Sequence, residues 1–112
     1  MKESNQAQAR KLLKPYRIKI DALDDQIVRL LSARFGVVRK IAKIKIKHDL
    51  PSFLHDRVVE VRDRNVKRAK KYGIDPAFIY NLYSAIIYQS CGVEDELRKK
   101  PRKKRSRPKP PA

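Results

Sequence analysis

Residues 20–45 decide the fold of this chain, and they read IDALDDQIVRLLSARFGVVRKIAKIK. Apolar side chains recur in this stretch at intervals of three and four residues, the spacing of one buried face of an α-helix. The positions on that face are Ile20, Leu23, Ile27, Leu30 or Leu31, Arg34, Val38, Ile41 and Lys45. The pattern predicts a long helix whose apolar stripe carries two cations, Arg34 and Lys45.

The two cations on this stripe point in the same direction. Lys45 follows Arg34 by 11 positions. Eleven steps of about 100° return to within about 20° of the start, roughly 16 Å further along the helix. Because unpaired cations are almost never fully buried, a basic pair on a core face requires an anion. We therefore predict a site for a small anionic ligand.

The long helix also has a consequence for assembly. We expect it to run from about Pro15 to about Lys47, after a polar N-terminal extension over residues 1–14. A helix of about 33 residues is about 50 Å long, more than the diameter of a compact domain of this size. Two shorter helices cannot cover such a stripe. We therefore predict a helical dimer whose long helices run side by side.

A second helix follows a loop that contains Pro51. Ser52 or Asp56 would cap its N-terminus, and it would continue to Tyr72. Gly73 would then occupy the C′ position that ends the helix.

A third helix and a basic tail complete the chain. Asp75 and Pro76 predict an N-cap followed by proline at the first helical position, and the helix would reach about Leu97. The helical domain would thus span 15–97. The tail over 98–112 holds nine lysines and arginines and no acid, and we expect it to be disordered.

Composition excludes several classes of protein. Cys91 is the single cysteine, so neither a disulfide within the chain nor a cysteine-based metal cluster is expected. No apolar run is long enough for a membrane span or a signal peptide, and we expect a cytoplasmic protein. The net charge of +17 suits attraction of anionic substrates or of nucleic acid.

Four more residues have settings that an anionic ligand would explain. Arg57 falls in the first turn of the second helix, where the helix dipole disfavours a cation. Ser90 and Glu94 are four residues apart and share one face of the third helix. Arg17 lies about 25 Å along the axis from Arg34, too far to share its pocket within one straight helix. Arg17 would instead join the equivalent pocket of a dimer partner.

With these residues in place, the chain resembles the all-helical, AroQ-type chorismate mutases over about residues 10–97. The stretches that carry the resemblance are Arg17-Ile-Lys-Ile-Asp-Ala-Leu-Asp-Asp, Leu30-Leu-Ser-Ala-Arg34, Lys43-Ile-Lys45, Asp56-Arg57 and Ile86-Ile-Tyr-Gln-Ser90 with Glu94. The resemblance implies an all-α, intertwined homodimer of three-helix chains. It also implies rearrangement of chorismate to prephenate, a shikimate-pathway step toward the aromatic amino acids, with no cofactor or metal.

The same resemblance assigns substrate-binding roles to four residues. Arg34 would bind one substrate carboxylate, and Arg57 would bind the second carboxylate side. Arg17 would come from the partner subunit, and Ser90 would be the serine of the third helix.

Lys45 and Glu94 would be the catalytic pair in such a site. The rearrangement breaks a carbon–oxygen bond ahead of carbon–carbon bond formation, so negative charge grows on the ether oxygen and preorganised donors stabilise it. Lys45 is one donor. Glu94 can be the second only when protonated, which burial beside apolar groups would favour. Alternatively, Arg34 and Lys45 snorkel to solvent at the edge of the stripe, and Glu94 is one of three solvated acids. In the same alternative Arg57 is a solvated charge and Ser90 is a small packing residue.

The chain departs from the family pattern at two positions. Val58 stands where many members carry a glutamate that contacts the substrate hydroxyl, and Leu54 stands where an aspartate can precede the arginine. The Arg57-Val58 pair also resembles the isochorismate pyruvate lyases, which share the fold and would give salicylate and pyruvate. Lyase activity is therefore an alternative prediction.

Two readings of another class remain. The basic tail would give salt-dependent, non-specific contact with nucleic acid, although no recognition helix, aromatic stacking platform or zinc knuckle is visible in the sequence. The chain would otherwise be a catalytically silent helical dimer that docks on another enzyme.

Overall fold

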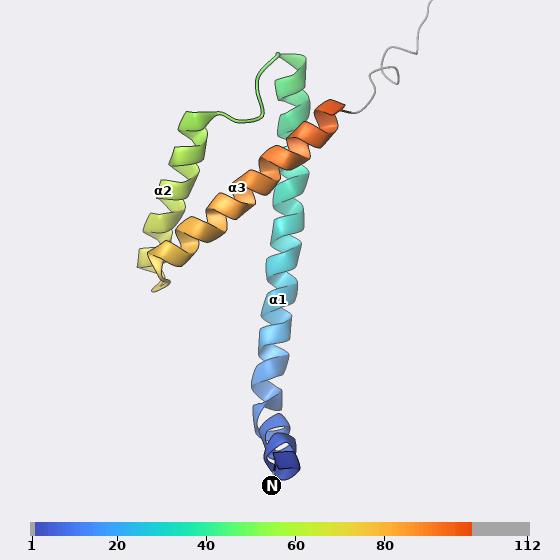
Figure 1. Ribbon diagram of the computed structural model, residues 1–112, viewed down its shortest axis with the longest axis vertical. Coiled ribbons are helices and arrows are strands. Elements are labelled where there is room, and N and C mark those ends of the chain that lie inside the picture. The colour runs from blue at the N-terminus through green and yellow to red at the C-terminus, as the bar shows by residue number, and fades with distance from the viewer. Residues whose placement is uncertain (1, 100–112) are drawn as a thin grey trace, which may run out of the picture. The chain divides into compact units, whose positions relative to one another are not determined.

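The structure is a computed structural model that describes residues 2–99, with side chains from residue 5 onward. It contains three helices, α1 (Lys2–Lys47), α2 (His55–Lys71) and α3 (Pro76–Lys99), and the described residues form no strand (Figure 1). The predicted all-α chain of three helices with a very long first helix is confirmed.

The chain divides into two compact units, Met1–Arg34 and Phe35–Ala112. The first unit is the N-terminal part of α1, a single helix. The second unit contains the last turns of α1 together with α2 and α3. Within it, α2 and α3 diverge from the short turn that joins them, like the arms of a V (Figure 1).

The start of α1 differs from the prediction. The helix begins at Lys2 and Pro15 lies inside it, so the expected start near Pro15 is wrong. Proline lacks an N–H and crowds the carbonyl four residues earlier, which normally ends or kinks a helix. Residues 6–14 are nevertheless strong helix formers (Gln, Ala, Arg, Lys and Leu) and carry the helix through. The first turns of α1 leave the line of the remaining helix in Figure 1.

The C-terminus of α2 has the geometry predicted for it. Gly73 has a positive φ of 71°, and its N–H donates to the carbonyl of Lys70 at 3.3 Å. The N–H of Ile74 donates to the carbonyl of Ala69 at 2.8 Å. This pair of bonds is a Schellman motif with glycine at C′, as the sequence indicated.

The C-terminus of α1 closes with the same pair of bonds but without glycine. The N–H of Leu50 donates to the carbonyl of Lys45 at 2.8 Å, and that of Asp49 donates to Ile46 at 3.3 Å. Asp49 therefore takes the left-handed position, with a φ of 56°. Aspartate tolerates this conformation better than most residues, but glycine has no Cβ to strain it.

The predicted N-cap is confirmed for α3 and is wrong for α2. In α3, the Asp75 side chain accepts a hydrogen bond from the N–H of Ala77 at 3.0 Å, which confirms the predicted cap. In α2, the N-cap is Leu54 and no side chain caps it. The prediction of Ser52 or Asp56 as the cap is wrong, because Ser52 lies two residues further out and bonds α3 instead.

The buried core is small and lies in the second unit. Its apolar members are Val38, Ala42, Val61, Ala69 and Ile87. On α1 the buried face passes through Val38, Ala42 and the half-buried Lys45. Ile41, which we placed on the same stripe, is 41% exposed in the single chain, so its burial stays a prediction.

α3 ends at Lys99, two residues beyond the predicted end, and Arg98 belongs to the helix rather than to the tail. The rest of the basic tail, from residue 100 onward, lies outside the described residues. Among residues 2–99, no helix is both long and apolar enough to cross a membrane.

We predict that Asp49→Gly stabilises the protein, because it removes a Cβ from a left-handed residue. Removal of the backbone strain should raise the free energy of unfolding by about 0.5–1 kcal/mol. The greater conformational entropy of glycine in the unfolded chain offsets part of this gain. Urea denaturation at a fixed protein concentration measures the change. The matched variant Gly73→Ala, which adds a Cβ at the same place in α2, should lower stability by about 1 kcal/mol. A loss of stability in Asp49→Gly would contradict the argument.

Candidate functional site

Lys45 lies in the last turn of α1, and its ammonium group is largely buried. The side chain is 13% exposed, so the alternative that it snorkels to solvent is contradicted. Its Nζ donates to the backbone carbonyl of Ser52 at 2.9 Å and to Oε2 of Glu94 at 3.3 Å. An ammonium group has three N–H donors, so these two bonds leave one donor for a ligand.

Glu94 comes from α3 and forms a buried ion pair with Lys45. Its Oε1 lies 3.1 Å from Nζ of Lys45, and its side chain is 6% exposed. The alternative of a solvated acid is therefore contradicted. The surroundings also differ from those we predicted, since the nearest group is a cation rather than apolar side chains. Oε1 is buried and takes part in no hydrogen bond; its contact is the ion pair with Lys45.

Ser90 lies one turn before Glu94 on the same face of α3 and is 8% exposed. Its hydroxyl donates to the carbonyl of Ile86 at 2.8 Å, a bond within its own helix. The predicted residues Lys45, Ser90 and Glu94 are thus all at least partly buried in the second unit.

Arg57 is in the first turn of α2, as predicted, but its observed partner is within the helix. Its guanidinium donates to Oε1 of Glu60 at 2.7 Å, and its side chain is 60% exposed. This hydrogen bond, together with the nearby charge of Arg64, lowers the pKa of the Glu60 carboxyl. The anion that a cation at this helix end requires is therefore supplied by Glu60 when no ligand is present.

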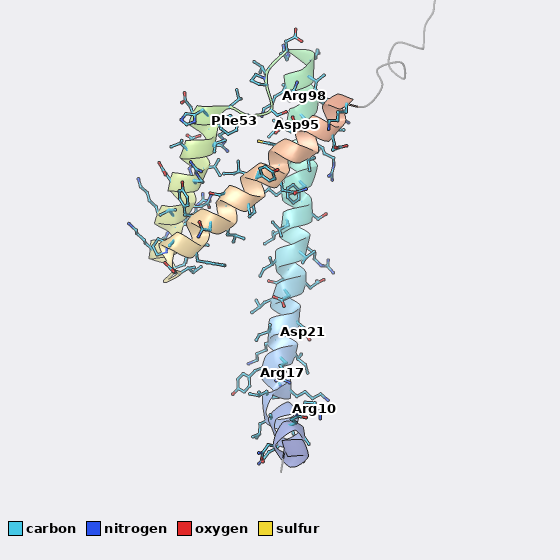
Figure 2. The ribbon with its side chains drawn as sticks, viewed as in Figure 1. Arg10, Arg17, Asp21, Phe53, Asp95 and Arg98 are labelled. Atoms are coloured by element: carbon cyan, nitrogen blue, oxygen red, sulfur yellow. The ribbon has the colours of Figure 1, made fainter. Side chains whose placement is uncertain are left out.

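Arg17 and Arg34, the other two predicted residues, lie on α1 in the first unit. Arg17 is labelled in Figure 2, one turn before Asp21 on the same helix. Their roles in a shared site stay predictions.

The sequence did not reveal a set of contacts around the loop that follows α1. Ser52 donates its hydroxyl hydrogen to Oδ1 of Asp95 at 2.8 Å and accepts a bond from Nε of Arg98 at 2.8 Å. Arg98 also donates to the carbonyl of Leu50. The predicted tail includes Arg98, but the spacing of Ile87, Cys91, Glu94 and Arg98 continues one helix face past the predicted end of the helix. This spacing in the sequence could have placed Arg98 on the third helix.

A pocket of about 180 Å³ opens between α2 and α3. Its lining residues are Phe53, Val58, Arg62, Ser84, Ile87, Tyr88 and Cys91. Nε of Arg62 and the hydroxyl oxygen of Ser84 are buried there and make no hydrogen bond. The pocket that Val58 lines thus has mostly apolar walls with one cation, Arg62, and none of these lining residues is an acid.

Comparisons with known proteins agree on one family. The sequence pattern of the family described as chorismate mutase type II matches residues 16–95. A 4-amino-4-deoxychorismate mutase of Streptomyces venezuelae is 36% identical over 74% of this chain and 81% of its own length. Another from Streptomyces pristinaespiralis is 32% identical over 71% of this chain and 62% of its own length. The T-protein of Haemophilus influenzae is 27% identical, and the chain spans only 22% of it. No solved structure matches the chain significantly.

Cys91 allows the electrostatics of this site to be measured. Burial raises the pKa of its thiol, the charges of Glu94 and Asp95 raise it further, and the charge of Lys45 opposes them. We expect the rate of alkylation by iodoacetamide to reach half its maximum at a higher pH than for an ordinary cysteine, because only the thiolate reacts.

Two variants test the signs of these contributions. Glu94→Gln removes a negative neighbour and should move the midpoint of the alkylation profile to lower pH. Lys45→Gln removes the positive neighbour and should move it to higher pH. Shifts in the same direction for both variants would contradict the electrostatic explanation. Midpoints are compared rather than rates, because partial burial slows access at every pH.

Proposed function

The chain belongs to the chorismate mutase type II family, and we propose that it rearranges chorismate to prephenate, a step of aromatic amino-acid biosynthesis. The observation that carries this proposal is the buried pair of Lys45 and Glu94, joined at 3.1 Å across α1 and α3. A buried lysine ammonium group is a donor suited to a substrate oxygen that gains negative charge, and the Glu94 carboxyl holds that ammonium group in place.

The chemistry needs donors rather than a nucleophile. In the rearrangement one carbon–oxygen bond breaks and one carbon–carbon bond forms within the same molecule, so no atom is gained or lost. The ether oxygen carries increasing negative charge in the transition state. Lys45 would donate to it from one side, and Glu94, which accepts from Lys45 in the free protein, would donate from the other only after taking up a proton when the substrate binds. Because the site is mostly closed to water, such donors are more effective than they are in solution.

Arginines would hold the substrate in its reactive conformation. We expect Arg34 and Arg57 to bind the substrate carboxylates, since the guanidinium group matches a carboxylate with two parallel hydrogen bonds. Arg57 would exchange its exposed partner Glu60 for the ligand, at low cost because an exposed ion pair contributes little stability. Ser90 would contribute a hydroxyl to the same site.

A second substrate, 4-amino-4-deoxychorismate, is favoured by the names of the two Streptomyces relatives. Its amino group would be a cation near neutral pH and would require a carboxylate. Val58 occupies the position where many family members carry glutamate, and its pocket holds the cation Arg62. We therefore place chorismate first. Isochorismate lyase activity, nucleic-acid contact through the tail and a cytoplasmic location stay predictions.

A homodimer would complete the site. The described residues of the first unit, 2–34, form a single helix, which has nothing within its own unit to cover its apolar side chains. Those of the predicted stripe are among its exposed residues: Ile20 at 55%, Leu23 at 55%, Ile27 at 54% and Leu30 at 70%. A second copy would bury them, and Arg17 on the same helix would then reach the partner's site.

The first test incubates the purified protein separately with chorismate, 4-amino-4-deoxychorismate and isochorismate, and identifies the products. We expect prephenate from chorismate. Lys45→Ala should lower kcat by about 10²–10³-fold, because it removes a donor to the charge that develops in the transition state. Folded protein that consumes none of the three substrates would contradict the proposal.

The role of Glu94 predicts a specific pH dependence. Activity that depends on Glu94 as a donor should fall as pH rises, because only a protonated carboxyl has an O–H to donate. Glu94→Gln keeps an N–H donor at every pH, so its profile should be flatter while activity at low pH is retained. A flat profile for the unaltered protein would argue against Glu94 as a donor.

Mixed dimers test whether Arg17 acts across subunits. Arg17→Ala and Lys45→Ala should each be inactive alone. A mixed dimer of the two has one site with both residues intact, so statistical mixing should restore about a quarter of the activity. The control mixture combines Arg34→Ala with Lys45→Ala. Each chain would supply both Arg34 and Lys45 to the same site, so each site of the mixed dimer lacks one of them and no activity should be restored. No recovery in the first mixture would contradict the dimer-spanning site.

A further inference from the structure

The loop between α1 and α2 supplies one of the two observed partners of Lys45. The carbonyl of Ser52 accepts a hydrogen bond from Nζ at 2.9 Å, slightly shorter than the bond of 3.3 Å to Glu94. Ser52 lies outside the helices, so no helical hydrogen-bond ladder fixes the direction of its carbonyl. The position of the ammonium group therefore depends on whatever holds this loop.

Asp95 and Arg98 of α3 hold the loop through its side chain and backbone, and Sγ of Cys91 on the same helix makes a longer contact of 3.9 Å with the Ser52 carbonyl. Asp95 accepts the hydroxyl hydrogen of Ser52 at 2.8 Å, and Arg98 donates to the same hydroxyl oxygen at 2.8 Å and to the carbonyl of Leu50. We call Ser52, Asp95 and Arg98 the loop clamp. Asp95 and Arg98 are labelled near the C-terminal end of α3 in Figure 2.

The clamp leaves Ser52 little freedom. Its hydroxyl both donates and accepts, so its orientation is determined from two sides. Arg98 contacts the loop on both sides of Pro51, whose ring already fixes one backbone angle. The bonds to Asp95 and Arg98 are charge-assisted and so stronger than neutral ones.

The same stretch of α3 also carries Glu94. Lys45 is thus oriented by two groups that α3 controls: the Glu94 carboxylate directly, and the Ser52 carbonyl through Asp95 and Arg98. An ammonium group with two of its donors directed in this way has a defined direction for the third.

We propose that Asp95 and Arg98 are positioning residues for Lys45, acting through Ser52 to direct its remaining N–H toward the substrate. This inference rests on the proposed function, in which Lys45 is the donor to the ether oxygen. Neither residue would touch the substrate. Their loss would therefore affect transition-state stabilisation more than substrate binding, because the donor acts on charge that develops in the transition state.

The kinetic test compares two neighbouring charge removals in the last turn of α3. Arg98→Gln releases the loop, whereas Lys99→Gln removes an equal charge from a side chain that is 75% exposed and pairs with Glu96. We expect kcat to fall about tenfold in Arg98→Gln with little change in KM, and no change in Lys99→Gln. Equal effects in the two variants, or an effect confined to KM, would overturn the proposal.

A double-mutant cycle separates positioning from general stability. Ser52→Ala keeps the backbone carbonyl but loses both bonds of the hydroxyl, and should lower kcat by a similar factor, whereas Ser52→Thr should retain activity. In a Lys45→Ala background, Ser52→Ala should have no further effect, because its target is already absent. Additive losses would show a merely structural role and overturn the proposal.

A chemical measurement tests the clamp without reference to catalysis. Acetic anhydride modifies lysine side chains, and mass spectrometry gives the rate at Lys45 separately from the exposed lysines. We expect Lys45 to be modified roughly threefold faster in Arg98→Gln and Ser52→Ala than in Lys99→Gln, because the ammonium group is then held less firmly. Equal rates of Lys45 modification in the three variants would overturn the proposal that the loop clamp holds Lys45, even if the enzyme is active. Faster modification in a protein without mutase activity would retain the clamp and refute the proposed function.

Discussion

A buried charge must be paired, and the pair of Lys45 and Glu94 is the constraint on which the rest of the second unit depends. The side chains are 13% and 6% exposed, so separating them would leave a charge without solvent or partner. The buried apolar core of this unit has few members, and two of them, Ala42 and Ala69, are alanines. Polar contacts therefore have an unusually large part in fixing how α1 meets α3.

The elements that the sequence predicted correctly are those governed by local chemistry. The turn at Gly73 and the cap at Asp75 follow from residues a few positions apart, and both were found. The buried Lys45 was predicted because a cation interrupted an apolar period of three and four. Each of these predictions needed only the helical repeat and the backbone preferences of single residues.

The predictions that failed depend on distances that the sequence does not contain. Ser52 is a good capping residue, but its hydroxyl lies between Asp95 and Arg98, more than 40 positions away. Pro15 normally ends a helix, yet the residues before it continue the helix to Lys2. Nor did the helical repeat show that Glu94 faces a cation. Tertiary contacts decided the cases of Ser52 and Glu94, whereas the helix propensity of the preceding residues decided that of Pro15.

The family pattern ends at residue 95, whereas the contacts that hold the loop after α1 extend to Arg98. The end of the family pattern and the end of the contacts that hold the loop therefore lie at different residues. A chain truncated at the end of the family pattern, or fused to another protein there, would lack Arg98. It would then lose the hydrogen bonds that Arg98 donates to the loop beside the site. The last full turn of α3 belongs with the site, and a boundary drawn after Lys99 would preserve it.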